Sequence, residues 1–241
     1  MKYLLPLFFT GMVAIAQPRE VDPAAVLILD KMSTLIGQLQ SCNYTLSTST
    51  DVEDYPYGLV KNYGYAEVYM AGPDKMVVHT HQNDHHKGYW YNGDSLTYYS
   101  FDENNYVKIP TPNTILKTID SLKATYEIDF PAADFFYPTF TDDILNNFDQ
   151  LHYIGEDVID HQNCFHLKAE NKDMAVQIWI ANESFTHPVQ VVIAYKGKEN
   201  TPRYEAKFEN WEVNPVLPNA MFEFTPPAGA RLIAIMAISE E

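Results

Sequence analysis

Along most of this chain, apolar and polar residues alternate with a period of two. Residues i and i+2 of a β-strand lie on the same face, so each alternating run predicts a strand with one apolar face. The clearest examples place Val68 beside Met70 and Ile178 beside Ile180. Short polar turns join these runs, which is typical of antiparallel neighbours. The pattern therefore restricts the chain to a large antiparallel sheet with one dry face and one wet face.

Turn signals divide the alternating runs into strands. The turn at Gly72-Pro73-Asp74 and the hairpin signal at Asn92-Gly93 are the strongest of them. A sheet of about ten or more strands must curl, split or close, because each strand twists against the next. The expected strands are 44–48, 65–70, 75–81, 89–91, 96–101, 106–109, 152–156, 158–160, 164–170, 175–181, 189–196, 203–212, 221–224 and 232–238.

Helical periodicity is confined to the start and the middle of the chain. Asp22 and Pro23 are the residue types preferred at the N-cap and first position of a helix. Helices are therefore expected over 22–41, 114–126, 131–136 and 142–149. They are too few to cover both faces of the sheet. We expect a mainly β (α+β) fold: a strongly curved antiparallel sheet with an N-terminal helix and a helical insertion packed on or across its concave side. Periodicity leaves open whether its interior is solid or hollow.

The first residues have the form of a secretory leader. Met1-Lys2 supplies a basic start, an apolar run follows, and Ala14-Ile15-Ala16 fits a small-x-small cleavage site. We expect residues 1–16 to be a signal peptide and 17–241 to be a single secreted domain. No other stretch reaches the ~18 apolar residues of a membrane span, so an integral membrane protein is not expected. The net charge of −16 argues against binding nucleic acid or anionic headgroups through simple electrostatics.

The two cysteines, Cys42 and Cys164, would lie in an oxidising compartment. An even pair there is compatible with one disulfide, and equally with two separate buried thiols. Both readings stay open at this point.

Few residues carry a chemical signal. His79 and His81 lie at i and i+2 of an expected strand and can face one metal ion, with Asp84, His85 and His86 nearby. The alternative is a solvated hairpin face. The sequence has no Ser in a nucleophile elbow and no Gly-rich phosphate loop. We therefore expect no catalysis, no metal and no cofactor, and keep a metal-dependent enzyme built on His79 and His81 as a second alternative.

Several short motifs resemble a bacterial family. They are Asn163–Leu167, Gln177–Ile180, Pro202–Tyr204, Asn210-Trp211 and Phe222–Pro227, in this order and spacing. Together they resemble the "predicted periplasmic protein" family of unknown function, within the LolA/LppX-like lipoprotein-carrier superfamily. Gly72 departs from the family pattern, because a basic residue often precedes the Pro-Asp turn. Ala175 and Val176 also depart from it, because an Asp-Trp pair often stands there. These departures bear on ligand specificity more than on architecture.

The resemblance implies an unclosed barrel with a helical lid and an apolar cavity, which in related carriers takes lipid or acyl chains. It leads us to expect a non-catalytic periplasmic carrier for an acyl chain, a lipid or a lipidated protein. The alternative is an envelope protein–protein interaction module with a solid core. Expected lid residues are Ile119, Phe135, Phe136 and Phe148. Expected cavity-lining residues are Val68, Met70, Met76, Val78, Leu96, Tyr98, Leu167, Ile178, Ile180, Val191, Ile193 and Phe208.

Overall fold

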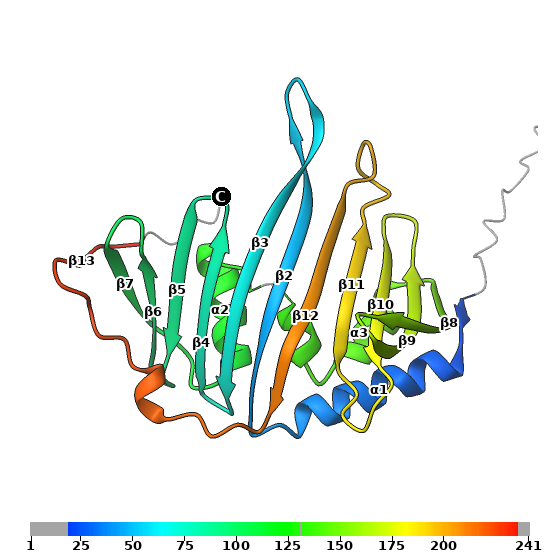
Figure 1. Cartoon of the computed structure of the whole chain (residues 1–241), viewed down its shortest axis with the longest axis horizontal. Helices are drawn as coiled ribbons and strands as arrows, with labels where there is room; N and C mark the ends of the chain where they lie inside the picture. Colours follow the sequence, from blue (N-terminus) through cyan, green and yellow to red (C-terminus); the bar gives the residue numbers. More distant parts are fainter. Residues whose placement is uncertain (1–18, 131, 236–241) are drawn as a thin grey trace, which may run out of the picture.

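The computed structural model describes residues 19–130 and 132–235, so the expected signal peptide lies outside the described residues. Its centre is a 13-stranded, strongly curved and unclosed sheet (Figure 1). All pairings are antiparallel except the two edge pairs, β1 with β8 and β13 with β7. This confirms the expected fold class. The strands are β1 Glu20–Val21, β2 Ser41–Asp54, β3 Gly58–Ala71, β4 Lys75–Gln82, β5 His85–Tyr91, β6 Ser95–Ser100, β7 Asn105–Pro110, β8 Gln150–Ile159, β9 Gln162–Glu170, β10 Ala175–Ala181, β11 Pro188–Ala194, β12 Arg203–Val213 and β13 Arg231–Leu232.

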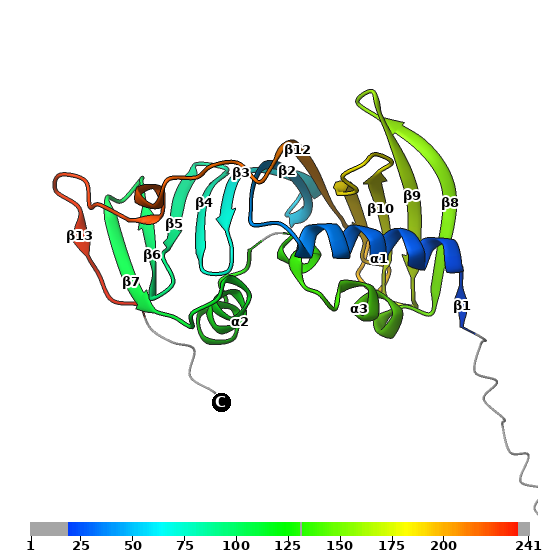
Figure 2. The ribbon, with the colours of Figure 1, turned by 90° about the horizontal axis from the view of Figure 1, so that it is seen from below.

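The sheet consists of two meanders joined side by side. Strands β2 to β7 follow one another in space, and we call them the first half-sheet. Strands β8 to β12 do the same and form the second half-sheet. The halves meet where β12 pairs with β2, so β7 and β8 lie near opposite ends of the sheet. The chain between β7 and β8 must therefore cross a whole face, and this crossing carries the helical insertion (Figure 2).

The first helix, α1 Pro23–Gly37, begins as its sequence predicts. The Asp22 carboxylate accepts a hydrogen bond from the Ala24 N–H, and Pro23 occupies the first turn. Residues at helical spacing bury one stripe: Ala25, Leu29, Met32 and Ile36. The helix ends at Gly37, four residues before the expected end. In Figure 2 it runs along one end of the second half-sheet, and it contacts β8.

The insertion contains α2 Ile115–Tyr126, the 3₁₀ helix η1 Ala133–Phe136 and α3 Phe140–Asn147. Helix α2 begins at Thr114, whose hydroxyl accepts from the Lys117 N–H, and it buries Ile115, Ile119 and Leu122. Figure 2 shows α2 below the first half-sheet and α3 below the second, both on the same side. The insertion therefore lies across the concave face. No helix in the described ranges combines the length and the apolar character that a membrane span requires.

One large apolar cluster lies between the concave face and the helices. The opposite face carries a smaller cluster and the C-terminal segment. Phe224 packs there against Trp90, Tyr99 and Tyr106, with ring centroids 5.0 to 5.4 Å apart. Residues 214–230 thus run from the middle of the sheet to its β7 edge along the side opposite α2 and α3 (Figure 2).

Four expected strands differ in the structure. Residues 152–156 and 158–160 belong to one strand, β8, in which the register shifts between Tyr153 and Gly155. Residues 221–224 do not form a strand. They overlap the 3₁₀ helix η2 Asn219–Phe222, because Phe222 and Phe224 act as anchors on the sheet and not as members of it. Of 232–238 only Leu232 lies in a strand, and 236–238 lie outside the described residues.

The cysteines do not form a disulfide. Both are free and buried. Cys42 on β2 belongs to the concave cluster, and Cys164 on β9 belongs to the cluster on the opposite face. Four strand spacings separate β2 from β9, roughly 19 Å, whereas a disulfide needs Cα atoms within about 7 Å. Burial also raises the pKa of the Cys42 thiol to about 12, which keeps it protonated.

Candidate ligand-binding cleft

A cleft of about 890 Å³ lies between the second half-sheet and the helical insertion. Its volume is in the range of sites that take small organic molecules. The register of three strands builds its floor. Val176, Ile193 and Tyr204 form one row across β10, β11 and β12, and Ile178 and Val191 form the next row. The alternation in these strands thus places apolar side chains side by side under the cleft.

The roof of the cleft is aromatic and comes from η1, α3 and the residue after it. Phe135, Phe140, Ile144 and Phe148 are buried and line the cleft. Phe135 packs on Phe140 with ring centroids 4.7 Å apart and on Phe208 at 5.4 Å, which fixes η1 against the sheet. Floor and roof together give the cleft an apolar interior.

The rim of the cleft is acidic. Asp120, Asp129, Asp134 and Asp143 line it, and Lys123 is the one basic residue among the described residues that do so. Lys123 is already engaged, because its Nζ lies 2.9 Å from an Asp129 carboxylate oxygen.

Two further rim carboxylates accept hydrogen bonds from the insertion itself. The Tyr137 hydroxyl donates to Asp120 at 2.6 Å, and the Thr139 hydroxyl donates to Asp143 at 2.8 Å. The Asp120 carboxylate raises the pKa of Tyr137 further, beyond the effect of burial. Asp134 differs, because its carboxylate has no hydrogen-bond or ion-pair partner in the described chain. The rim therefore offers one unengaged carboxylate.

Tyr204 adds an unused polar group to the wall. Its hydroxyl oxygen is buried and has no hydrogen-bond partner among the described residues. Burial, followed by the nearby Tyr195 and Asp134, raises the pKa of Tyr204 to about 12, so the hydroxyl keeps its proton. A buried hydroxyl without a partner costs about 1–3 kcal/mol. A ligand in the cleft can supply the missing partner.

The first half-sheet lacks such space. There a crevice of only about 30 Å³ remains, with room for one or two waters. Helix α2 and the rings of Phe130 and Phe136 fill the rest, and Phe136 stacks on Tyr44 with centroids 5.8 Å apart. Ile119, Phe130 and Ala133 line both spaces, so these three side chains lie between the crevice and the cleft.

All twelve expected cavity-lining residues belong to the concave cluster or pack against it. Four line the crevice, namely Val68, Met70, Met76 and Val78, and three line the cleft, namely Ile178, Val191 and Ile193. Leu96, Tyr98, Leu167, Ile180 and Phe208 line neither space.

The four expected lid residues all line one or both of these spaces. Phe135 and Phe148 line the cleft, Phe136 lines the crevice, and Ile119 lines both. Ligand binding by any of these residues stays a prediction.

Sequence reasoning missed several residues of the cleft. Val176 shares the alternating face of Ile178, and Tyr204 shares that of Phe208, so the period of two could have identified both. The four rim aspartates had no such signal. They come from separate segments of the insertion and meet only because the chain folds across the sheet.

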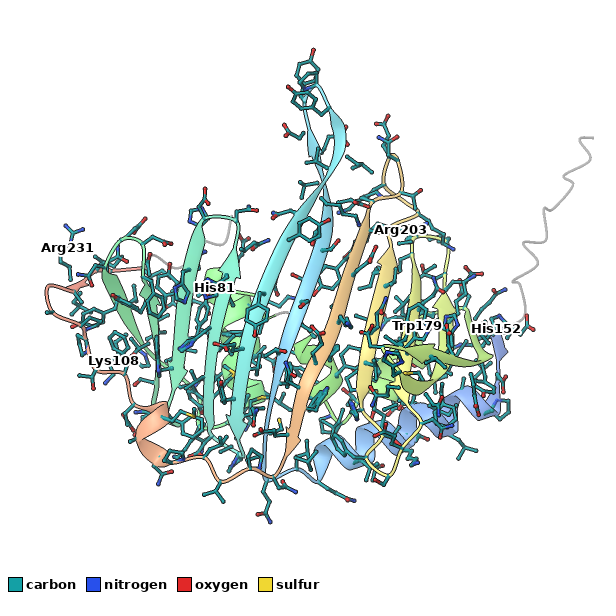
Figure 3. All side chains as sticks on the ribbon, in the orientation of Figure 1. His81, Lys108, His152, Trp179, Arg203 and Arg231 are labelled. Atoms are coloured by element: carbon teal, nitrogen blue, oxygen red, sulfur yellow. The ribbon has the colours of Figure 1, made fainter. Side chains whose placement is uncertain are left out.

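The histidines of the expected metal cluster lie on the face of the sheet opposite the cleft. His81 stacks on His86 at 3.7 Å, and His86 stacks on Phe101 at 3.7 Å with the planes 5° apart. The rings therefore lie flat on one another and do not converge on a point. No group of three or more metal-ligating side chains occurs within residues 19–130 and 132–235. Figure 3 shows His81 on β4, well separated from Trp179 on β10 of the other half-sheet.

Comparisons with known structures agree with this fold. An uncharacterized conserved protein from Thermus thermophilus is 12% identical, with a TM-score of 0.50, and the match covers 87% of this chain and 98% of the other. The lipoprotein LppX of Mycobacterium tuberculosis is 16% identical, also with a TM-score of 0.50, and the match covers 82% and 98%. At such identities the likeness concerns the fold alone. No curated protein matches the sequence.

The family comparison is more specific. The model of the family described as "Predicted periplasmic protein (DUF2092)" matches residues 25–236, nearly the whole chain described. This confirms the resemblance based on the motifs, and the family description agrees with the secretion expected from the leader. The chain belongs to the predicted periplasmic protein family DUF2092.

Proposed function

We propose that this protein is a non-catalytic carrier that holds one acyl chain in the cleft of its second half-sheet. The observation that carries the proposal is the open apolar cleft of about 890 Å³, whose floor and roof consist of aliphatic and aromatic side chains. The carrier superfamily that the motifs resemble supports the same role, since its cavities take lipid or acyl chains.

The energetics favour a single saturated chain. Burying a methylene gains about 0.8 kcal/mol, so about ten methylenes gain ~8 kcal/mol before the costs of association. Association costs of about 4 kcal/mol leave an affinity on the order of millimolar for ten methylenes. Each further buried methylene tightens binding about fourfold. Such binding needs no charged anchor.

The lining of the cleft also favours binding over catalysis. Among the described residues that line it there is no Ser, Cys or His. The carboxylates stand at the rim, exposed to solvent, where burial does not prepare them as acids or bases.

The test is displacement of the neutral fluorophore N-phenyl-1-naphthylamine by dodecanol, with stoichiometry from native mass spectrometry. We expect one dodecanol per chain. Ile193→Trp, which fills the floor, should weaken binding at least tenfold. Val192→Trp is the matched control, because the neighbouring residue of the same strand packs on the opposite face and leaves the cleft unchanged. Absence of dodecanol binding, or equal loss in both variants, would refute the proposal.

A second candidate function rests on the β2–β3 hairpin, which projects beyond the rest of the sheet (Figure 1). Tyr55, Tyr57 and Tyr63 are 95%, 78% and 67% exposed there. We infer that this tip docks an envelope protein, because three exposed tyrosines gather on one projecting hairpin and tyrosine is enriched at protein–protein interfaces. A photo-crosslinker at position 57 should trap one discrete partner in cells, and Tyr55→Ser with Tyr63→Ser should abolish the crosslink. A crosslink pattern that those changes leave intact would reject this candidate.

A further inference from the structure

We propose that the cleft selects its ligand by head group: it takes single-chain lipids whose head carries no negative charge and donates a hydrogen bond, such as a hydroxyl or an ammonium. This inference rests on the proposed function and names the ligand class of the same cleft. It is carried by two independent observations, namely the charge of the rim and the unpartnered hydroxyl of Tyr204.

The rim repels anions. Four aspartates and one lysine stand around the opening, and that lysine is paired with Asp129. A carboxylate or phosphate head placed there would meet a net negative charge at short range, with no free cation among the described lining residues to receive it. An ammonium head would be attracted by the same charges.

Asp134 and Tyr204 define where the head lies. Asp134 and Tyr204 both line the cleft, Asp134 at the exposed rim and Tyr204 with a buried hydroxyl that has no hydrogen-bond partner among the described residues. A hydroxyl or ammonium head can donate to the Asp134 carboxylate, and a hydroxyl oxygen can accept from Tyr204. The same head would satisfy both groups. The alkyl chain would then lie along the row that continues from Tyr204 to Ile193 and Val176.

The experiment compares dodecylamine, dodecanol and dodecanoate as competitors of N-phenyl-1-naphthylamine on the full mature chain at neutral pH. The three share one chain and differ only in the head. We expect dodecylamine to bind about tenfold more tightly than dodecanoate at low ionic strength, with dodecanol between them. At about 0.3 M salt the ratio should shrink to about twofold, because the rim charges are exposed and screened.

Matched variants separate the rim from the charge of the whole protein. Asp134→Asn should reduce the amine-to-carboxylate ratio about threefold. Asp142→Asn removes an acid from the first turn of α3 that does not line the cleft, and it should leave the ratio unchanged. Tyr204→Phe should weaken dodecanol about fivefold without loss of stability in the free protein, because the deleted hydroxyl has no partner there.

The outcomes distinguish the two proposals. If dodecanol binds but dodecanoate binds as tightly as dodecylamine, the head-group inference is wrong and the carrier function stands. If Asp142→Asn changes the ratio as much as Asp134→Asn, overall charge governs the preference and the inference is again wrong. If none of the three competitors binds, the carrier function itself fails.

Discussion

The two half-sheets offer nearly the same apolar face, yet only one of them is hollow. Val68 and Val78 on the first half alternate just as Ile178 and Val191 do on the second, and all four are buried. Over the first half, α2 and two phenylalanines leave about 30 Å³, whereas over the second half the insertion leaves about 890 Å³. The two volumes differ because the helices over each half-sheet pack against different partners. In the second half α3 and η1 pack against α1, which occupies the end of that half-sheet. A cavity in this fold is therefore decided by the helices above the strands.

The largest expected effect on stability comes from placing a tryptophan on the concave face of the first half-sheet, and the same change in the second half-sheet is its comparison. Val78→Trp should lower the free energy of unfolding by about 3 kcal/mol, because the crevice cannot take the ring. Ile193→Trp should change stability by less than about 1 kcal/mol, because the cleft holds the ring. Urea unfolding followed by circular dichroism measures both. Equal losses would mean that the cleft is not free space in solution.

The next comparison truncates one helix residue over each half. Leu122→Ala on α2 should lower the free energy of unfolding by about 3 kcal/mol, because it opens an enclosed void. Ile144→Ala on α3 should cost about 1 kcal/mol, because its side chain already borders open space. Thermal and urea unfolding of both variants would check the order. A larger loss of stability for Ile144→Ala than for Leu122→Ala would contradict the presence of open space beside α3.

Phe130→Ala removes part of the partition between crevice and cleft, because Phe130 lines both spaces. We expect the joined space to accept a longer chain, so that the preference for octadecanol over dodecanol rises about fivefold. Phe101→Ala serves as control, because Phe101 packs on the histidines of the opposite face. The measurement is fluorophore displacement by the two alcohols. An unchanged preference would show that the crevice stays closed without this ring.

The smallest expected effect is the response to acid, to which buried histidines of both halves contribute. Burial lowers the pKa of His79 and His86 in the first half and of His187 in the second. Since the unfolded imidazoles keep a pKa near 6.5, the unfolded state binds more protons below that pH. Stability should therefore fall as the pH drops through and below 6.5.

Either His79→Gln or His187→Gln should flatten this dependence, by less than about 2 °C in Tm between neutral pH and pH ~5. Scanning calorimetry across that range measures it. His161→Gln is the control. If neither variant changes the dependence of Tm on pH, the acid response belongs to other groups.

Local patterns predicted much of the fold. The period of two located most strands of both halves, and Asp22 and Thr114 marked the starts of α1 and α2. The failures have physical causes. Strand β8 continues through Asp157, where the expected strands were divided, because Asp157 pairs with Cys164 of β9. The real irregularity lies earlier, between Tyr153 and Gly155, where Gly155 has a φ of 138°. Phe222 and Phe224 look like a strand, but they serve as anchors on the opposite face.

The sequence by itself determined that a large sheet would bury one face, that short helices would lie over it, and that the chain resembles an envelope family. These properties follow from neighbours along the chain, whose spacing decides which way each side chain points. Only the tertiary structure decided that β12 pairs with β2, that the chain crosses from β7 to β8, and that four aspartates meet at one opening. The space beneath them depends on contacts between segments far apart in sequence, such as Phe135 on Phe208, and no periodicity encodes the distance between two such layers.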